Sequence, residues 1–67
     1  MAKAESWGER IHRARLERGL PAGELARKAK VALTTIYGIE SGLRQPRPTT
    51  LRKILQALKK IPKLPEI

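Results

Sequence analysis

The chain contains no cysteine and a single histidine, His12, among its 67 residues. This composition excludes disulfides and thiolate metal sites, and one histidine cannot form a metal cluster alone. The uninterrupted apolar runs are only a few residues long, against the ~20 residues that a membrane-spanning helix needs, and no signal-peptide pattern opens the chain. We therefore expect one small cytoplasmic domain over residues 1–67, with a core at about 6–61, a tail at 62–67, and no metal or other cofactor.

Acidic side chains are also scarce. The six Asp and Glu residues stand against fifteen Lys and Arg residues, which gives a formal net charge of +9. This charge exceeds what solubility requires of a small domain and favours a polyanionic partner, nucleic acid first and an anionic membrane second. The alternative is an ordinary solvated surface.

The sequence has none of the usual patterns of a catalytic site. It shows no paired carboxylates at cleft spacing, no activated nucleophile and no glycine-rich phosphate loop. We therefore predict that the protein is not an enzyme and has no small-molecule ligand.

Two helices are predicted in the first half of the chain. Ser6 and Glu9 have the spacing of a capping box, and the helix that they open should end at about Gly19. Trp7 lies on the apolar face of this helix and is expected in the core, where it would anchor the helix on the last one. A second helix over about 22–29 follows a proline, which is well tolerated in a first turn.

Two more helices are predicted in the second half. The segment VALTTIYGIESG (31–42) has apolar residues at helical spacing and ends in a glycine. After a loop that contains two prolines, Pro48 should begin a last helix. The apolar stripe of that helix consists of Leu51, Ile54, Leu55, Leu58 and Ile61. No segment alternates like a β-strand, so we predict an all-α, compact fold of four to five helices, the fifth being at most a short turn in the tail.

The middle of the chain has the spacing of a helix-turn-helix. Two short helices that cross steeply need a small residue at their contact, and Ala26 supplies it. Apolar residues at fixed offsets should hold the pair together: Leu25, Ala29, Val31, Ile36 and Ile39. An ordinary helical hairpin is the alternative, but it would not explain the charge.

The segments GERIHRARLERGL, ELARKA, VALTTIYGIESG and LRQP with TTLRKILQAL resemble the lambda-repressor-like (Cro/cI, or XRE-type) DNA-binding domain over about residues 7–58. The resemblance implies sequence-specific binding of double-stranded DNA by a transcriptional regulator of the repressor type, with the third helix in the major groove. It also implies a homodimer on an inverted repeat. Within the domain it implies an ion pair between Arg15 and Glu40, which would link the first helix to the third.

The resemblance places the DNA-binding site on the third helix and the loops beside it. Apolar side chains at its start can contact thymine methyl groups, and its hydroxyl groups can hydrogen-bond base edges, while Gly38 would let the backbone approach DNA closely. Two loop arginines can reach phosphates. A lysine occupies the turn, where the family usually has glycine and where a left-handed backbone has a cost. The predicted site residues are Lys30, Ala32, Leu33, Thr34, Thr35, Tyr37, Gly38, Arg44 and Arg47.

Other uses of the apolar surfaces stay open at this stage. The third helix is almost uncharged, so Leu33 and Tyr37 could instead pack on a protein partner in a protein-interaction module. The last helix is basic and amphipathic, which alone would suit a membrane surface, but its apolar stripe is needed for the core. The tail offers dimer contacts that could equally cap the core of a monomer: Ile61, Leu64 and Ile67.

Overall fold

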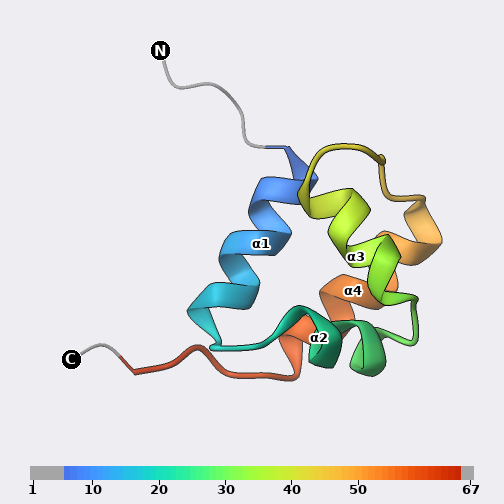
Figure 1. The fold of residues 1–67 in the computed structure, drawn as a ribbon. Helices are drawn as coiled ribbons and strands as arrows, with labels where there is room; N and C mark the ends of the chain where they lie inside the picture. Colours follow the sequence, from blue (N-terminus) through green and yellow to red (C-terminus); the bar gives the residue numbers. More distant parts are fainter. Residues whose placement is uncertain (1–5, 66–67) are drawn as a thin grey trace, which may run out of the picture.

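The computed structural model describes residues 6–65, which form four α-helices and no β-strand (Figure 1). The all-α prediction is therefore confirmed, and no fifth helix is present between α4 and residue 65. Local signals in the sequence placed the helix ends to within one or two residues. The helices are α1 (Trp7–Glu17), α2 (Ala22–Ala29), α3 (Leu33–Glu40) and α4 (Pro48–Lys59).

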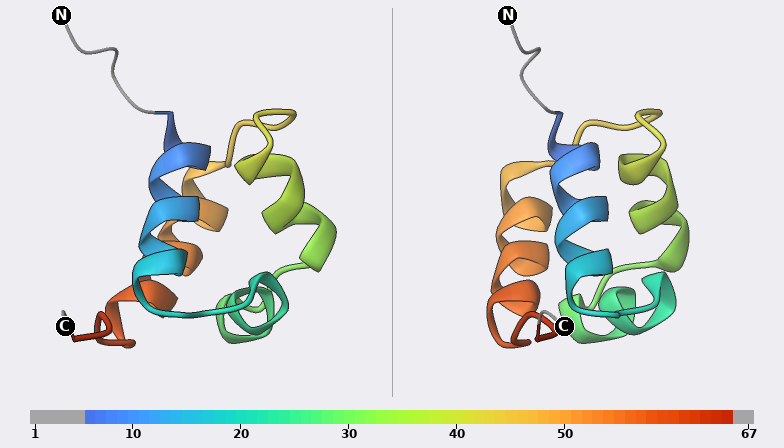
Figure 2. Two further views of the ribbon diagram at one scale, coloured as in Figure 1. Left: turned by 60° about the vertical axis from the view of Figure 1, so that its left-hand side comes forward. Right: turned by 90° about the vertical axis from the view of Figure 1, so that its left-hand side faces the viewer.

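The helices surround one core. In Figure 2, α1 lies between α3 and α4, and α2 crosses below these three; accordingly, α1 packs on α3 and α4, and α2 packs on the same two helices. The predicted helix-turn-helix contacts at Leu25, Ala26 and Ile36 are all buried. The full core consists of Ile11, Leu20, Ala22, Leu25, Ala26, Ala29, Ile36, Ile39, Ile54, Ala57 and Leu58.

The turn between α2 and α3 is held in a strained conformation. Lys30 has a φ of 58°, which makes it the one non-glycine residue with a positive φ within residues 6–65. The next amide, of Val31, donates to the Ala26 carbonyl at 3.0 Å and closes the end of α2. A left-handed conformation costs a residue with a side chain about 1–2 kcal/mol. The cost predicted for this lysine is thus present at the turn where the chain changes direction into α3.

α1 and α3 approach each other closely because Gly8 has no side chain. Gly8 is buried, and a Cβ atom at this position would overlap the carbonyl oxygen of Ile39 on α3. Any larger residue would push the two helices apart. Gly8 therefore sets the distance at which α3 lies from the rest of the domain.

Arg15 and Glu40 form the ion pair that joins α1 to α3. Arg15 Nε lies 2.9 Å from Glu40 Oε2, and Arg15 Nη2 donates to Oε1 at 2.9 Å. The two side chains are only 12% and 8% exposed. Arg15 Nη1 also donates to the carbonyl of Leu20 at 3.1 Å, which ties the α1–α2 connection to the same group. The predicted pair is confirmed, in bidentate geometry.

His12 adds a third group to this pair. Its side chain is 49% exposed, and its Nδ1 lies 2.8 Å from Glu40 Oε1. The pKa of Arg15 is raised because its guanidinium hydrogen-bonds the Glu40 carboxylate. Burial acts to raise the pKa of Glu40, but the hydrogen bonds from Arg15 and His12 outweigh it and lower this pKa. Glu40 is therefore ionised at neutral pH.

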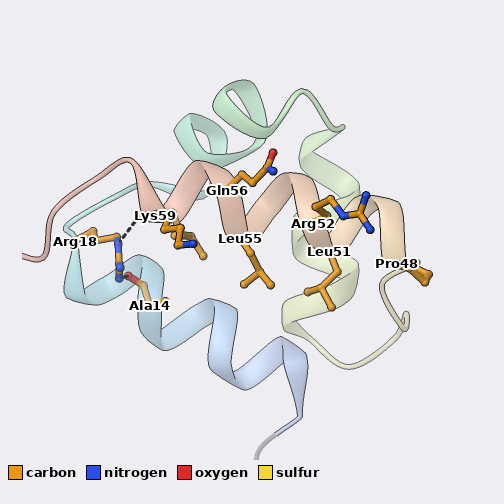
Figure 3. A pocket seen from close by; sticks show the side chains of 9 residues that line it. Ala14, Arg18, Pro48, Leu51, Arg52, Leu55, Gln56 and Lys59 are labelled. Atoms are coloured by element: carbon orange, nitrogen blue, oxygen red, sulfur yellow. Dashed lines mark hydrogen bonds between the residues drawn. The ribbon is translucent and has the colours of Figure 1, made fainter.

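Arg18 fastens the end of α4 to α1. Its Nε donates to the carbonyls of Leu58 and Ile61 at 2.9 and 2.8 Å, and its Nη1 donates to the carbonyl of Ala14 at 2.9 Å (Figure 3). Ile61 packs against the core, so it caps the monomer. The Leu64 amide donates to the Glu17 carbonyl at 2.9 Å, although its side chain is 59% exposed. Ile67, the third tail residue considered for a dimer contact, lies outside the described residues.

Two side chains that were expected in the core lie exposed at the surface. Trp7 is 37% exposed, with the Arg10 guanidinium 4.7 Å from the centroid of its ring, and Leu55 is 39% exposed. The prediction of a buried Trp7 is therefore wrong. Leu55 borders an open groove between α1 and α4 (Figure 3), called the α1–α4 groove below. The groove is lined by Ala14, Arg18, Pro48, Leu51, Arg52, Leu55, Gln56, Leu58 and Lys59.

None of the helices in residues 6–65 is long and apolar enough to cross a lipid bilayer.

We expect strong coupling between Arg15 and Glu40 in folding stability. Removing either side chain leaves the other charge without its partner in a largely buried site, so Arg15→Met or Glu40→Leu alone should lower the free energy of unfolding by about 3 kcal/mol. The double variant should cost less than the sum of the two. Urea unfolding of all four proteins measures the coupling, and purely additive losses would show that the pair does not hold α3 in place.

Candidate nucleic-acid interface

The outward face of α3 is exposed and carries no charge. Leu33 and Tyr37 are 41% and 56% exposed, and Thr34 is exposed between them. The charged residue of this helix, Glu40, turns inward to Arg15. Because the opposite face of the helix is fixed in the core, these three side chains can contact a partner without competing with the fold.

The start of α3 is open to solvent. Ala32 occupies the N-cap in an extended conformation, with φ −71° and ψ 147°, and no side-chain hydrogen bond caps the helix. Ala32 and Leu33 are both exposed there. The first amide groups of a helix carry a partial positive charge, so this end of α3 is electrostatically suited to an anionic partner.

Gly38 does not lie on the exposed face. It is buried, and the three atoms nearest to a Cβ built on it all belong to Arg44: Cδ at 3.0 Å, Cγ at 3.2 Å and Nε at 3.4 Å. Gly38 was expected to let the backbone of α3 approach DNA closely, which requires an open, outward position. That position is wrong, because the loop after α3 folds back and the Arg44 side chain covers the glycine. Thr35 is only partly exposed.

Three predicted site residues come together beside α3. Thr35, Arg44 and Arg47 all line one hollow between α3 and the loop that follows it. Both arginines are exposed. Two cations therefore lie beside the uncharged face of α3 rather than on it.

Lys30 lies in a separate basic cluster. It shares a hollow between the end of α2 and α4 with Lys28, Lys53 and Lys60. We call these four residues the lysine cluster. Sequence reasoning singled out only Lys30, although the seven-residue spacing of Lys53 and Lys60 was a signal that both lie on one side of α4.

The model of the helix-turn-helix family matches residues 11–63. The chain belongs to this family, in its lambda-repressor-like or XRE-type form. The helix-turn-helix unit consists of α2 and α3, and α3 stands at the position of the recognition helix.

Two similar proteins agree with this assignment. The chain is 41% identical over 56 residues to the HTH-type transcriptional repressor RghR of Bacillus subtilis (strain 168), an alignment that covers 82% of this chain and 42% of the repressor. The chain thus spans less than half the length of that relative. The fold is similar to a crystal structure of a mutant of the restriction-modification controller protein C.Esp1396I, with a TM-score of 0.77 and 32% identity over 79% of this chain and 69% of that chain.

Proposed function

We propose that this helix-turn-helix domain binds double-stranded DNA sequence-specifically, as the DNA-binding part of a transcriptional regulator of the repressor type. The observation that carries the proposal is the uncharged, exposed face of α3 with the exposed Arg44 and Arg47 in the hollow beside it. The family match and the repressor relative support it. The same findings favour a binding function over a catalytic one.

In this proposal α3 enters the major groove with its first turn against the bases. Ala32 and Leu33 contact thymine methyl groups, and the hydroxyl groups of Thr34 and Tyr37 hydrogen-bond base edges. These contacts select the sequence.

The affinity for DNA comes from arginine and lysine side chains that lie outside α3. Arg44 and Arg47 bind phosphates next to α3, and Lys30 adds a contact from the lysine cluster. Phosphate contacts fix the position of the domain on the duplex but carry little sequence information, so the two groups of residues have separable effects.

Salt and mutation should separate these two groups. With five to seven phosphate contacts, log K should fall against log salt with a slope of about −0.9 per contact. Arg47→Ala should weaken binding to all duplexes alike and reduce the slope by about one contact, whereas Thr34→Ala should change the base preference by ~1–3 kcal/mol at one or two positions and leave the slope unchanged. Fluorescence anisotropy at several salt concentrations measures both quantities.

Lys63→Ala is the matched control. It removes one exposed cation that lies 3.8 Å from Glu17, at the far end of α1, so the slope should stay as it is. An affinity that does not depend on salt would contradict DNA binding. Salt-dependent binding without any base preference would instead favour the use of Leu33 and Tyr37 for a protein partner.

We further propose that two copies bind together on an inverted repeat. Of the tail residues considered for this contact, Ile61 packs against the core of the domain, which leaves the 59% exposed Leu64 as a single small contact within residues 60–65. The α1–α4 groove offers Leu51 and Leu55 instead (Figure 3). Arg52 and Lys59 at its rim would repel the same residues of a second copy, so self-association should strengthen as salt screens these charges.

Leu55→Glu should therefore prevent self-association, because it places a charge in the apolar contact. Leu16→Glu is the control, since Leu16 is 56% exposed on α1 and lies outside the groove. Sedimentation velocity with and without an inverted-repeat duplex gives the number of copies. A wild-type protein that stays single on this duplex would contradict the dimer, and a dimer that survives Leu55→Glu would contradict the groove as its contact surface.

A further inference from the structure

The loop after α3 contacts Gly38 both through hydrogen bonds to its carbonyl group and through packing of a side chain. The backbone amide of Arg44 donates to the Gly38 carbonyl at 3.0 Å, and the hydroxyl of Ser41 donates to the same carbonyl at 3.2 Å. The aliphatic part of the Arg44 side chain then lies across the Cα atom of Gly38. Gly38 of α3 and Arg44 of the loop are thus in direct contact.

Nothing in the core requires a glycine at this position. The closest neighbours of a Cβ atom at residue 38 would be Cδ, Cγ and Nε of Arg44, at 3.0–3.4 Å, and no core side chain is among them. A glycine inside a helix costs about 1 kcal/mol relative to alanine. The glycine at residue 38 thus lowers the stability of α3, at a position where Arg44 occupies the space that another side chain would fill.

We propose that Gly38 is a positioning residue that acts through Arg44, and this inference rests on the proposed DNA-binding function. Because Gly38 has no side chain, the aliphatic part of Arg44 packs directly on the backbone of α3. The Arg44 guanidinium is thereby ordered beside α3 before DNA binds. A long side chain that is already ordered loses less conformational entropy on binding. Gly38 thereby strengthens a phosphate contact without touching DNA.

The geometry separates this role from direct contact with DNA. Gly38 is buried under Arg44, so a duplex that approaches this part of α3 meets the arginine first. A methyl group at residue 38 would lie 3.0–3.4 Å from Cδ, Cγ and Nε of Arg44, which is closer than an ordinary contact. The flexible Arg44 side chain would therefore have to shift from its present position, while the helix stays folded. The variant should therefore fold.

A double-mutant cycle tests the proposal. Gly38→Ala should weaken binding to selected and to scrambled duplexes alike, by about fivefold, which is the cost of immobilising one long side chain on binding. In a protein that already carries Arg44→Ala, the same change at residue 38 should have no further effect. The base preference should be unchanged in all four proteins, which a rearranged recognition helix would not allow.

Gly23→Ala is the matched control. Gly23 also lies in a short helix, but a Cβ atom there meets nothing within 4 Å, so this variant reports the gain in helix propensity alone. Both glycine variants should keep or raise the thermal stability, and Gly23→Ala should leave DNA affinity unchanged.

Each other outcome has a distinct meaning. A loss on Gly38→Ala that persists in the Arg44→Ala protein would show that DNA contacts residue 38 directly and would overturn the proposal. No loss in either background would overturn it as well. If the unmodified protein does not bind duplex DNA at all, the proposed function itself fails, which the wild-type titration shows before any variant is compared.

Discussion

The ion pair of Arg15 and Glu40 is the interaction on which the working face of this domain depends. It joins α1 to α3 in a largely buried site, and its arginine also holds the carbonyl of Leu20. The same pair turns the carboxylate of α3 inward, so the helix presents no negative charge to a polyanion. Together with the close approach that Gly8 allows, it fixes both the position and the electrostatic character of α3.

In the proposed mode of binding, the residues that attract DNA are separate from those that read its bases. All fifteen Lys and Arg residues of the chain lie outside α3, while the exposed surface of α3 consists of apolar and hydroxyl groups. Long-range attraction and base selection can then vary independently, because a change on α3 leaves the flanking cations intact. Gly38 and Arg44 connect the base-reading helix with the phosphate-binding cations, since the side chain of Arg44 in the loop packs on the backbone of Gly38 in α3.

The sequence predicted what local signals determine and missed what depends on tertiary approach. The end of α1 just before Gly19 and the start of α4 at Pro48 follow from backbone preferences, which act within a few residues. The ion pair followed only from the family resemblance, because helical spacing does not place distant side chains together. Trp7 was misplaced because periodicity gives the face of a helix but not how far its neighbour covers it. Gly38 was misplaced because the covering side chain comes from a loop whose path no local pattern specifies.

The most direct test of the central claim is selection of bound sequences from a pool of random duplex DNA. An uncharged recognition helix that reads bases should enrich one short motif, and a dimer should enrich it twice as an inverted repeat, with half-sites about one helical turn apart. Positions within the motif should include thymines, because in the proposed mode of binding Ala32 and Leu33 place methyl groups against the major groove. Binding that enriches no motif, although the protein retains DNA at low salt, would contradict the account.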